Sequence, residues 1–594
     1  MNTKDINIST TFKFFIKGDI SGIQEFIFNV KSQKAARVLR ARSIFVQMLS
    51  AFTQQWVEYN FDGTEKFYNG GGTFYLKLKS KQTFEEAHRR LKVCEAAVNK
   101  SIQKEDIYVS LSIVENHDNK SFQEVWKDLA KASNRDKLER FQKSIATFEP
   151  YDYDILEKDQ TSEDFEEESL QEKLELDNTT NIKKFKAKIF NFLNRNIAGE
   201  KLKYEASSLY DSIKSDLPQW EKDLFEAFKE DIEEENKRRK LEANEGETVP
   251  DIKEDSIIDY HFLAKFAYLR TGTRKIGILK MDIDNLGSLF SELPKAKEKF
   301  IKKDVEEAAK KISKTLSNFF NDTIYDLLNE DEEKLKKEYP EIEVEKFKDK
   351  IYPSVEDPES VAKASKFNQN IYTIFSGGDD CIFVGSWDAI LHWTKVLREK
   401  FDIYCGKKIK SIIHGIARDP DEIDISLPPT LSAGIVIVEP TYPVIRFAEL
   451  VEDVLNDAKI FTYTEEDKAE KNKVSLFGEV ITWEEYKKVT NLAKDLATLV
   501  KEHNEQRSTI AKLKDSAAIY QRIHKEIKLK KRVNIGISKL FYFARNTQNE
   551  EALSKSVIIP YSKDLIDSFA GIRNNNPMKY AMAARWAEFL TRKN

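Results

Sequence analysis

The chain is poor in cysteine, with only three among its 594 residues. Cys94, Cys381 and Cys405 lie far apart and form no Cys-x-x-Cys pair, so they exclude a four-thiolate zinc site and favour a reducing compartment. The sequence also lacks any run of eighteen apolar residues, and residues 1–11 are polar with no apolar leader segment. We therefore expect a cytoplasmic protein that does not cross a membrane.

A strong excess of one charge is missing as well. The chain has 96 basic and 101 acidic residues, which gives a net charge of −5. This balance argues against a protein that coats nucleic acid non-specifically, although it leaves room for a local basic groove. With 40% hydrophobic residues the chain can form several cores, and its length suggests about three to five domains.

The most informative stretch is residues 371–384, which reads I-Y-T-I-F-S-G-G-D-D-C-I-F-V. Gly377-Gly378 between two apolar runs predicts a β-hairpin, because a tight turn requires positive φ and glycine adopts it without strain. Asp379 and Asp380 follow at once. Adjacent carboxylates repel each other, so the pair favours a cation, and a hard ion such as Mg²⁺ takes oxygen ligands and shares them with phosphates.

A second acidic strand end supports a metal site. Residues 275–286 read K-I-G-I-L-K-M-D-I-D-N-L, which predicts a buried strand over 276–283 with Asp282 and Asp284 at its end. If this strand lies beside the hairpin, Asp282 joins Asp379 and Asp380 around one or two metal ions. Such a pair of metals clamps the attacking and leaving oxygens of a nucleotidyl transfer.

The apolar periodicity predicts an α+β protein in which one fold occurs twice. Residues 1–117 and 268–482 each read β-α-β-β-α-β, the ferredoxin-like arrangement of a palm domain. Residues 118–267 form a charged helical insert, and residues 483–594 form a C-terminal helical bundle. Both copies have a glycine-rich hairpin turn, but Thr73 and Phe74 follow the glycines of the first, which we therefore interpret as degenerate.

Several of these stretches together resemble the large, polymerase-like subunit of type III CRISPR effector complexes, in its Csm-type branch. The resemblance covers nearly all of the chain except the insert. The matching stretches are residues 18–28 (G-D-I-S-G-I-Q-E-F-I-F), 35–43 (A-A-R-V-L-R-A-R-S), 69–72 (N-G-G-G), 282–287, 376–380 (S-G-G-D-D), 431–434 and 457–459.

The resemblance implies a second palm that converts ATP into cyclic oligoadenylate messengers when a guide-RNA complex binds target RNA. It implies other subunits of that ribonucleoprotein, guide RNA, target RNA and ATP as partners, with Mg²⁺ or Mn²⁺ as cofactor. By matching positions, Asp379 and Asp380 are the candidate catalytic residues and, with Asp282, the candidate metal ligands. The candidate nucleotide contacts are Ser21, Gly70, Gly71, Gly72, Asp284, Asn285, Ser376, Gly377, Gly378 and Lys459.

Two departures from the family pattern carry their own expectations. Many members begin with an HD nuclease domain, whereas the first palm here starts by residue 12, so we expect no DNase activity from this chain. Many members also carry a cysteine zinc site between the palms, but the insert here contains no cysteine, and helical packing must stabilise it instead.

Three alternatives stay open at this point. The same acidic motif would serve a nucleotidyl transferase that joins AMP to another acceptor, such as S-adenosylmethionine. The chain could instead be a non-catalytic scaffold of the guide-RNA complex, although the intact Asp379-Asp380 pair argues against this. Finally, the basic side chains Lys31, Lys34, Arg37, Arg40 and Arg42 on the first long helix could reach phosphates or could form a solvated face.

Overall fold

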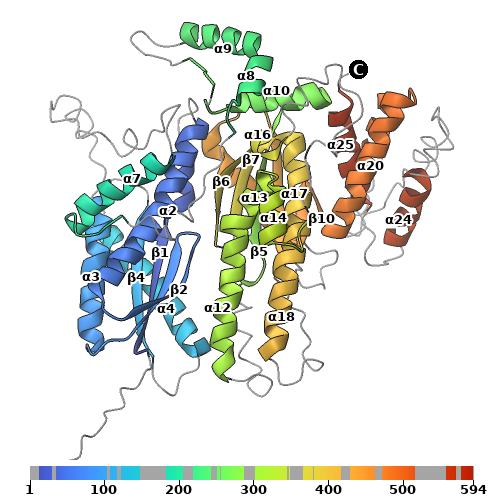
Figure 1. Ribbon diagram of the computed structural model, residues 1–594. Coiled ribbons are helices and arrows are strands. Elements are labelled where there is room, and N and C mark those ends of the chain that lie inside the picture. The colour runs from blue at the N-terminus through green and yellow to red at the C-terminus, as the bar shows by residue number, and fades with distance from the viewer. Residues whose placement is uncertain are drawn as a thin grey trace, which may run out of the picture.

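The computed structural model describes most of the chain, with gaps at both ends and in several loops. The described residues are 12–29, 35–102, 107–116, 122–146, 182–204, 210, 218–242, 251–254, 256–286, 302–343, 347, 366–378, 380–416, 429–461, 471–515, 557–569 and 577–592. Asp379 lies outside them. Figure 1 shows the arrangement, with the first sheet in blue, the second sheet in green to orange, and the last helices in red.

The first sheet has four antiparallel strands in the order β2-β3-β1-β4, which confirms the predicted ferredoxin-like fold. Its elements are β1 (Phe14–Ser21), α1 (Ile23–Phe28), α2 (Ala35–Asn60), β2 (Thr64–Gly70), β3 (Thr73–Leu78), α3 (Phe84–Ser101), β4 (Tyr108–Glu115) and α4 (Phe122–Ala146).

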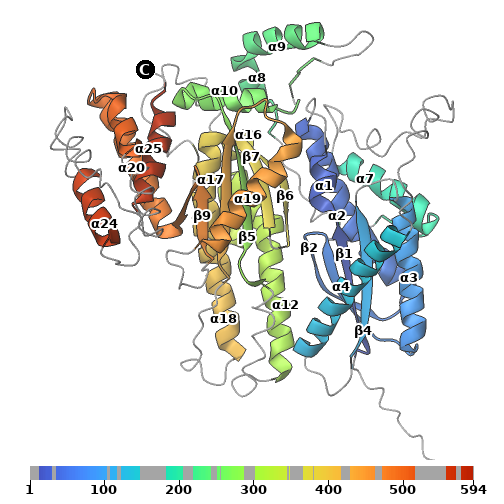
Figure 2. The same ribbon diagram turned by 180° about the vertical axis from the view of Figure 1, so that it is seen from behind.

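Side chains alternate along β1 and divide this unit into two layers. Phe14 and Ile16 belong to the large core that also contains residues of α2 and α3. Phe15 packs instead against Val125 and Leu129 of α4. Figure 2, seen from behind, shows α4 on the face of the sheet opposite to α2 and α3.

The second sheet has six strands in the order β10-β9-β8-β5-β7-β6, and its last four repeat the order of the first sheet. Only the β8–β9 pair is parallel. The elements from β5 onward are β5 (Ile276–Ile283), α12 (Lys302–Asn318), η2 (Phe319–Thr323), α13 (Ile324–Leu328), α14 (Glu332–Glu338), α16 (Phe367–Asn370), β6 (Ile371–Gly377), β7 (Asp380–Ser386), α17 (Trp387–Phe401), η4 (Asp402–Gly406), α18 (Lys407–Ile416), β8 (Leu431–Val438), η6 (Val444–Arg446), α19 (Phe447–Ile460), β9 (Lys473–Leu476) and β10 (Glu479–Thr482).

The second sheet is layered in the same way. Ile276 and Ile278 of β5 share a core with α19, whereas Leu279 and Met281 share a core with α17. Gly277 is needed on the α17 side, because a Cβ there would lie 2.9 Å from the Cβ of Ile390. Figure 2 shows α19 on the same side of the molecule as α4. The two palms therefore present equivalent faces in the same direction.

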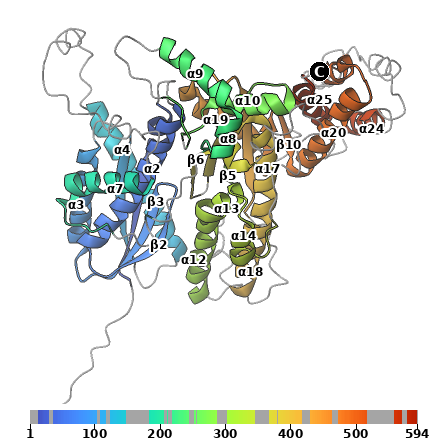
Figure 3. The same ribbon diagram turned by 45° about the horizontal axis from the view of Figure 1, so that its top comes forward.

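Helices of the insert cover the upper ends of both palms, as the tilted view in Figure 3 shows. They are α7 (Ile182–Leu193), η1 (Asn194–Ala198), α8 (Lys222–Ala227), α9 (Lys229–Glu242) and α10 (Tyr260–Thr271). Phe190 of α7 packs edge-on against Phe52 of α2, with the ring centroids 5.6 Å apart. Helical packing thus joins the insert to the first palm.

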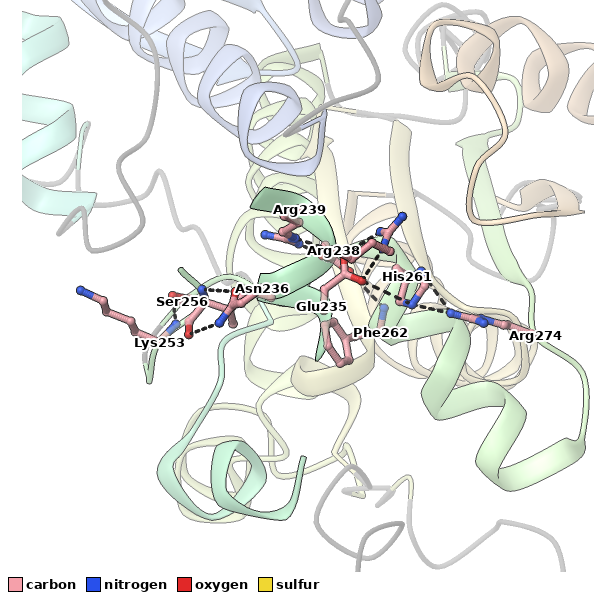
Figure 4. Close-up of polar contacts among 11 residues, drawn as sticks. Glu235, Asn236, Arg238, Arg239, Lys253, Ser256, His261, Phe262 and Arg274 are labelled. Carbon is pink, nitrogen blue, oxygen red and sulfur yellow. Dashed lines mark hydrogen bonds and ion pairs between the residues drawn. The ribbon is translucent and has the colours of Figure 1, made fainter. Parts of the chain in front are cut away.

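A polar cluster joins α9 to α10 (Figure 4). The buried Glu235 accepts hydrogen bonds from Arg238 (2.7 Å) and Arg239 (3.1 Å), and His261 lies 4.0 Å from its carboxylate. Arg274 in turn contacts the ring of His261. Burial raises the pKa of Glu235, but the two arginines outweigh burial and leave the pKa below its ordinary value.

The C-terminal helices are α20 (Trp483–Glu502), α24 (Ile559–Phe569) and α25 (Met578–Leu590), and they pack on the β10 edge of the second palm. The β9–β10 hairpin before them was not expected from the sequence. It turns at Phe477 and Gly478, whose φ values are both positive, and each of its strands has only four residues. Among the described residues, no helix is both long and apolar enough to cross a membrane.

Candidate active site

The predicted glycine hairpin is formed by β6 and β7, with its turn one residue later than the Gly-Gly pair suggests. Gly377 is still the last residue of β6 and pairs with Asp380, the first residue of β7. Of the two glycines only Gly378 has positive φ, at 73°. The pairing places the Asp380 side chain at the tip of the hairpin, where it is about a quarter exposed.

The second predicted carboxylate lies directly across from it. In the β5–β7 ladder, Asp282 is the partner of Asp380. Lys459 of α19 donates a hydrogen bond of 2.5 Å to Asp282, and the ammonium of Lys280 lies 3.9 Å from Asp380. The structure therefore brings together Asp282 and Asp380, as expected if the two strands are neighbours, and it places Lys459, a candidate nucleotide contact, beside them.

The electrostatics of this group favour a cation. Burial raises the pKa of Asp282 above its ordinary value, even though Lys459 acts in the opposite direction. A carboxylate whose charged form is disfavoured in this way gains stability when a cation is bound. Asp282 and Asp380 supply the hard oxygen donors that Mg²⁺ and Mn²⁺ prefer, so these residues fit the implied metal. Among the described residues, which do not include Asp379, no group of three or more His, Cys, Asp or Glu side chains is placed to hold a metal ion.

Asp284, two residues further on, is held by the protein itself. Its side chain is buried and accepts hydrogen bonds from the hydroxyls of Ser432 (2.7 Å) and Thr430 (2.8 Å) and from the backbone N–H of Asn472 (2.9 Å). These bonds tie the end of β5 to the beginnings of β8 and β9. The geometry gives Asp284 a positioning role in addition to any contact with a nucleotide.

Two further candidate nucleotide contacts flank the site. Asn285 is exposed and has positive φ (56°), which is typical of a turn. Ser376 is buried, and its hydroxyl donates to the carbonyl oxygen of Phe320 at 2.7 Å. Asn285 is therefore open to solvent, whereas the hydroxyl of Ser376 already has a partner within the protein.

The glycine turns of the two palms touch each other. Gly71 has a φ of 61°, and a Cβ on it would lie 3.0 Å from the carbonyl oxygen of Gly377 and 3.1 Å from the Cα of Gly378. Gly72 also has positive φ, and Ser21 lies close by, at the end of β1. The close approach of the two turns requires that these glycines have no side chain.

Both hairpins also have a β-bulge three residues before the end of their first strand. The register shifts at Phe67 in β2 and at Ile374 in β6. The carbonyl oxygen of Ile374 accepts a hydrogen bond from Arg40 of α2 (3.4 Å), and Arg40 also donates to the hydroxyl of Tyr325 (3.3 Å). The two hairpins thus share a local irregularity, and a buried arginine joins the two palms.

This contact corrects one sequence expectation. Arg40 and Arg42 are both buried, so they form neither a solvated face nor a phosphate contact. Arg42 donates to the carbonyl oxygens of Phe26 (2.5 Å) and Asn29 (2.7 Å) and so fixes α1 against α2. The side chains of Lys31, Lys34 and Arg37 lie outside the described part of the chain.

A cavity of about 610 Å³ opens between the palms, beside the touching turns. It is lined by α2, β2, α12, η2 and β6, including Gly70, Gly71, Gly72, Ser376 and Gly377. Gln47 and Ser50 of α2 also line it, and Gln47 Nε2 and Ser50 Oγ are buried and have no hydrogen-bond partner among the described residues. Buried polar atoms without partners are costly, so these two are suited to a ligand with hydrogen-bonding edges.

The first palm retains an altered copy of the acidic site. Asp19 of β1 pairs with Thr73 of β3, just as Asp282 pairs with Asp380. Lys17 lies 3.2 Å from Asp19, and Lys137 of α4 also forms an ion pair with it. Burial acts to raise the pKa of Asp19, but the two lysines outweigh burial and lower it, which is the opposite of the outcome at Asp282.

The sequence contains a signal for this copy that was not among its predictions. Residues 17–20 read K-G-D-I and residues 280–283 read K-M-D-I, a short repeat at the same place in each palm. Gln47 and Ser50 carried no such signal, because polar residues on a long helix normally face solvent. Only the packing of the second palm against α2 makes them part of a cavity.

Comparisons with known proteins agree with this architecture. Residues 275–475 match the family model of the Cas10/Cmr2 second palm domain, and residues 13–152 match that of Csm1 subunit domain B. The chain is 26% identical over 538 residues to the protein of Methanocaldococcus jannaschii named CRISPR system single-strand-specific deoxyribonuclease Cas10/Csm1 (subtype III-A), and it covers 59% of that protein. A protein of the same name from Enterococcus italicus is 22% identical over 543 residues and is covered to 60%. These two matches span 79% and 83% of the present chain, respectively.

Solved structures show the same fold. Csm1 of T. onnurineus has a TM-score of 0.56 at 16% identity, covering 98% of this chain and 70% of that one. A Csm1-Csm4 cassette in complex with cA3 also has a TM-score of 0.56 at 16% identity, covering all of this chain and 72% of that one. Two family models, curated relatives along most of the sequence and the shared fold agree: the chain is similar to the Cas10/Csm1 large subunits of type III-A CRISPR complexes.

Proposed function

We propose that this chain condenses ATP into cyclic oligoadenylates by nucleotidyl transfer at the hairpin of the second palm. The observation that carries the proposal is the pairing of Asp282 with Asp380, with Lys459 beside them, next to a cavity shared with the first palm. Solved Csm1-Csm4 cassettes are described in complex with ATP, pppApApA, cA3 and cA4, which supports an adenine nucleotide as the substrate here.

The reaction joins two nucleotides. The 3′-oxygen of the acceptor bonds to the α-phosphorus of the donor ATP, the bond from that phosphorus to the β-phosphate oxygen breaks, pyrophosphate leaves and the hydroxyl proton passes to solvent. Bound Mg²⁺ or Mn²⁺ would lower the pKa of the attacking hydroxyl and neutralise charge on the phosphate. Asp282 and Asp380, together with the predicted ligand Asp379, would hold these ions.

The remaining residues position the substrates. Lys459 is about one-fifth exposed, and its ammonium lies within the acidic group, where it can contact a triphosphate. The touching turns at Gly71 and Gly377 set the spacing between the palms, and the cavity beside them accepts a nucleoside. Holding both reactants in one geometry supplies much of the catalysis in such a transfer.

We further propose that the chain acts within a type III ribonucleoprotein containing other subunits, guide RNA and target RNA. Csm1 is found with Csm4 in the solved cassettes. The matched chain of each of these structures shares its fold with this chain over nearly its whole length. Target RNA bound by that complex would switch on synthesis.

The test is to incubate the assembled complex with labelled ATP and Mg²⁺ or Mn²⁺, with and without target RNA, and to resolve the products by mass. We expect target-dependent cyclic adenylates from the wild-type chain and none from the Asp379→Ala, Asp380→Ala double variant, with assembly unchanged. Asp453→Asn, an exposed carboxylate on α19, is the matched control and should retain activity. Product from the double variant would refute the metal assignment.

The same assay separates the alternatives. A new species that appears only when S-adenosylmethionine is added would identify a different acceptor. A complex that assembles on target RNA but forms no product under any condition would identify a scaffold.

A further inference from the structure

The first palm contains a complete lysine–aspartate arrangement that the proposed chemistry at the second palm does not use. Lys17 and Asp19 occupy the positions of Lys280 and Asp282 on the first strand of their sheets. The helix after the fourth strand then supplies one further lysine to the aspartate in each palm, Lys137 from α4 and Lys459 from α19.

The two arrangements differ in charge. Around Asp282 the second palm adds the carboxylate of Asp380, so the two lysines there face at least two carboxylates. The first palm has Thr73 at that position, and its hydroxyl donates to Asp19 at 3.1 Å. Among the described residues, Lys17 and Lys137 therefore form ion pairs with one shared carboxylate, and this group of three has a net charge of about +1 without any metal.

This charge is available to a ligand. The side chains of Lys17 and Lys137 are 15% and 28% exposed, so each ammonium can make additional contacts while Asp19 holds it in place. The group adjoins the glycine turn that lines the cavity between the palms, because Thr73 follows Gly72 directly. Both α4 and α19 lie on the same side of the molecule (Figure 2), so the group faces the same direction as the candidate active site.

We propose that Lys17 and Lys137 bind the 5′-triphosphate of the acceptor nucleotide directly, with no metal ion held by the first palm. Asp19 acts as the internal counter-ion that positions both lysines. The inference rests on the proposed function and adds to it the residues and the chemical group by which the degenerate palm selects its nucleotide. In the second palm Asp282 and Asp380 would hold a metal ion that supplies positive charge at the equivalent place, whereas in the first palm the replacement of one carboxylate by Thr73 leaves the lysines in excess.

The proposal predicts that the first condensation discriminates among acceptors by their 5′ group. The donor in the test is 3′-deoxyATP, which has no 3′-hydroxyl and cannot act as an acceptor. ATP, AMP or adenosine is then supplied as acceptor, with the donor in large excess. AMP and adenosine each yield a single dinucleotide and pyrophosphate, and for ATP, which can also act as a donor, the product measured is the dinucleotide that ends in 3′-deoxyadenosine. The activated complex with the wild-type chain should prefer ATP to adenosine.

The decisive variants are Lys17→Met and Lys137→Met. Each removes one charge-assisted contact and should raise KM for the ATP acceptor about tenfold, with kcat nearly unchanged. KM for adenosine should not change, because adenosine has no group for these lysines to bind. Activity with adenosine also shows that each variant is folded.

Lys92→Met is the matched control. Lys92 lies in the same palm and forms a similar group with Glu95 (2.9 Å) and Asp136 (3.2 Å), but it belongs to α3 and has no counterpart at the active site. It should leave the ATP preference intact. If Lys17→Met and Lys137→Met keep the wild-type ratio of kcat/KM for ATP over adenosine, the group is only structural and the proposal is wrong. A wild-type complex that makes no dinucleotide at all would instead refute the proposed function.

Discussion

A methyl group on Gly71 would lie 3.0 Å from the carbonyl oxygen of Gly377, so the glycine turns of the two palms meet backbone to backbone. Gly71 also has a φ of 61°, a conformation that residues with a Cβ seldom adopt. Gly71 therefore meets two separate requirements, its own left-handed backbone conformation and the close approach of the second palm. They can be separated by comparing two substitutions.

Gly71→Ala should reduce both stability and synthesis. The left-handed backbone conformation costs about 1–2 kcal/mol for a residue with a Cβ. The added methyl also pushes against the backbone of the second palm, and displacing one reactant by about 1 Å lowers the rate about a hundredfold. Thermal unfolding and the rate of dinucleotide formation measure the two effects.

Gly199→Ala is the matched control, because Gly199 has a similar φ of 58° but nothing within 4 Å of its added Cβ. It should lose a similar amount of stability to backbone strain and keep its activity. Equal activity losses in the two variants would show that contact between the turns does not set the geometry of the reaction.

The buried polar atoms of α2 lead to a second prediction. Ser50 Oγ and Gln47 Nε2 line the cavity without a partner, so a nucleobase can supply one. The hydroxyl of Ser50 can accept a hydrogen bond from the amino group of adenine, so we expect Ser50→Ala to reduce the preference for ATP over purine riboside triphosphate, which lacks that amino group, about tenfold or less. Gln47 Nε2 can only donate, to a ring nitrogen that both nucleotides have, so Gln47→Leu should raise KM for both nucleotides and leave the preference unchanged. Ser43→Ala is the control, because Ser43 Oγ is also buried without a partner among the described residues but does not line the cavity. An unchanged preference in Ser50→Ala together with an unchanged KM in Gln47→Leu would place the base elsewhere.

Much of this architecture could be predicted because the strands that build it are long and apolar. Residues 276–283 and 371–377 form strands as expected, and their order gives the repeated palm fold. The β9–β10 hairpin was missed, since four-residue strands around a Phe-Gly turn leave almost no periodic pattern. Gly22 was not expected to separate β1 from α1, but it adopts a φ of 81° directly before that helix.

The candidate site was predictable only in part, for a different physical reason. Carboxylates at the ends of apolar strands are easy to recognise in a sequence. Asp282 and Asp380 were predicted in this way, and the structure places them opposite each other. Residues whose role depends on the other palm were not found. Arg40 has the pattern of a solvated helix residue, and only the approach of β6 to α2 buries it.

A third prediction concerns pH and the cluster that joins α9 to α10 (Figure 4). Burial and Arg274 lower the pKa of His261, which also faces Asp259, Glu235 and Arg238. The folded state thus binds a proton at His261 less readily than the unfolded state, so stability is lost as the pH falls below about 6.5. Glu235, whose pKa is also lowered, adds a loss in the same direction at lower pH, below about 4.5.

Hydrogen exchange of α10 should therefore become faster between pH 7.5 and pH 5.5, after correction for the intrinsic dependence of exchange on pH. The variant His261→Gln removes the titrating group and should show a smaller acceleration over this range. An acceleration of the same size in His261→Gln would assign the effect to groups outside the cluster.

The last prediction sets Asp282 against Asp284, two carboxylates on one strand with opposite roles. Asp284 accepts hydrogen bonds from Ser432, Thr430 and Asn472, and its replacement by alanine removes the acceptor of the two hydroxyls, while the N–H of Asn472 keeps only its longer bond to Ser432 Oγ (3.1 Å). We expect Asp284→Ala to reduce the free energy of unfolding by about 3 kcal/mol. Asp282→Asn should instead preserve or slightly raise stability, because burial disfavours the charged form of Asp282 more than Lys459 stabilises it. Mn²⁺ titration followed by electron paramagnetic resonance, at a temperature where both variants are folded, should show metal binding weakened in Asp282→Asn and nearly unchanged in Asp284→Ala. The opposite pattern would make Asp284 the metal ligand and Asp282 the positioning residue.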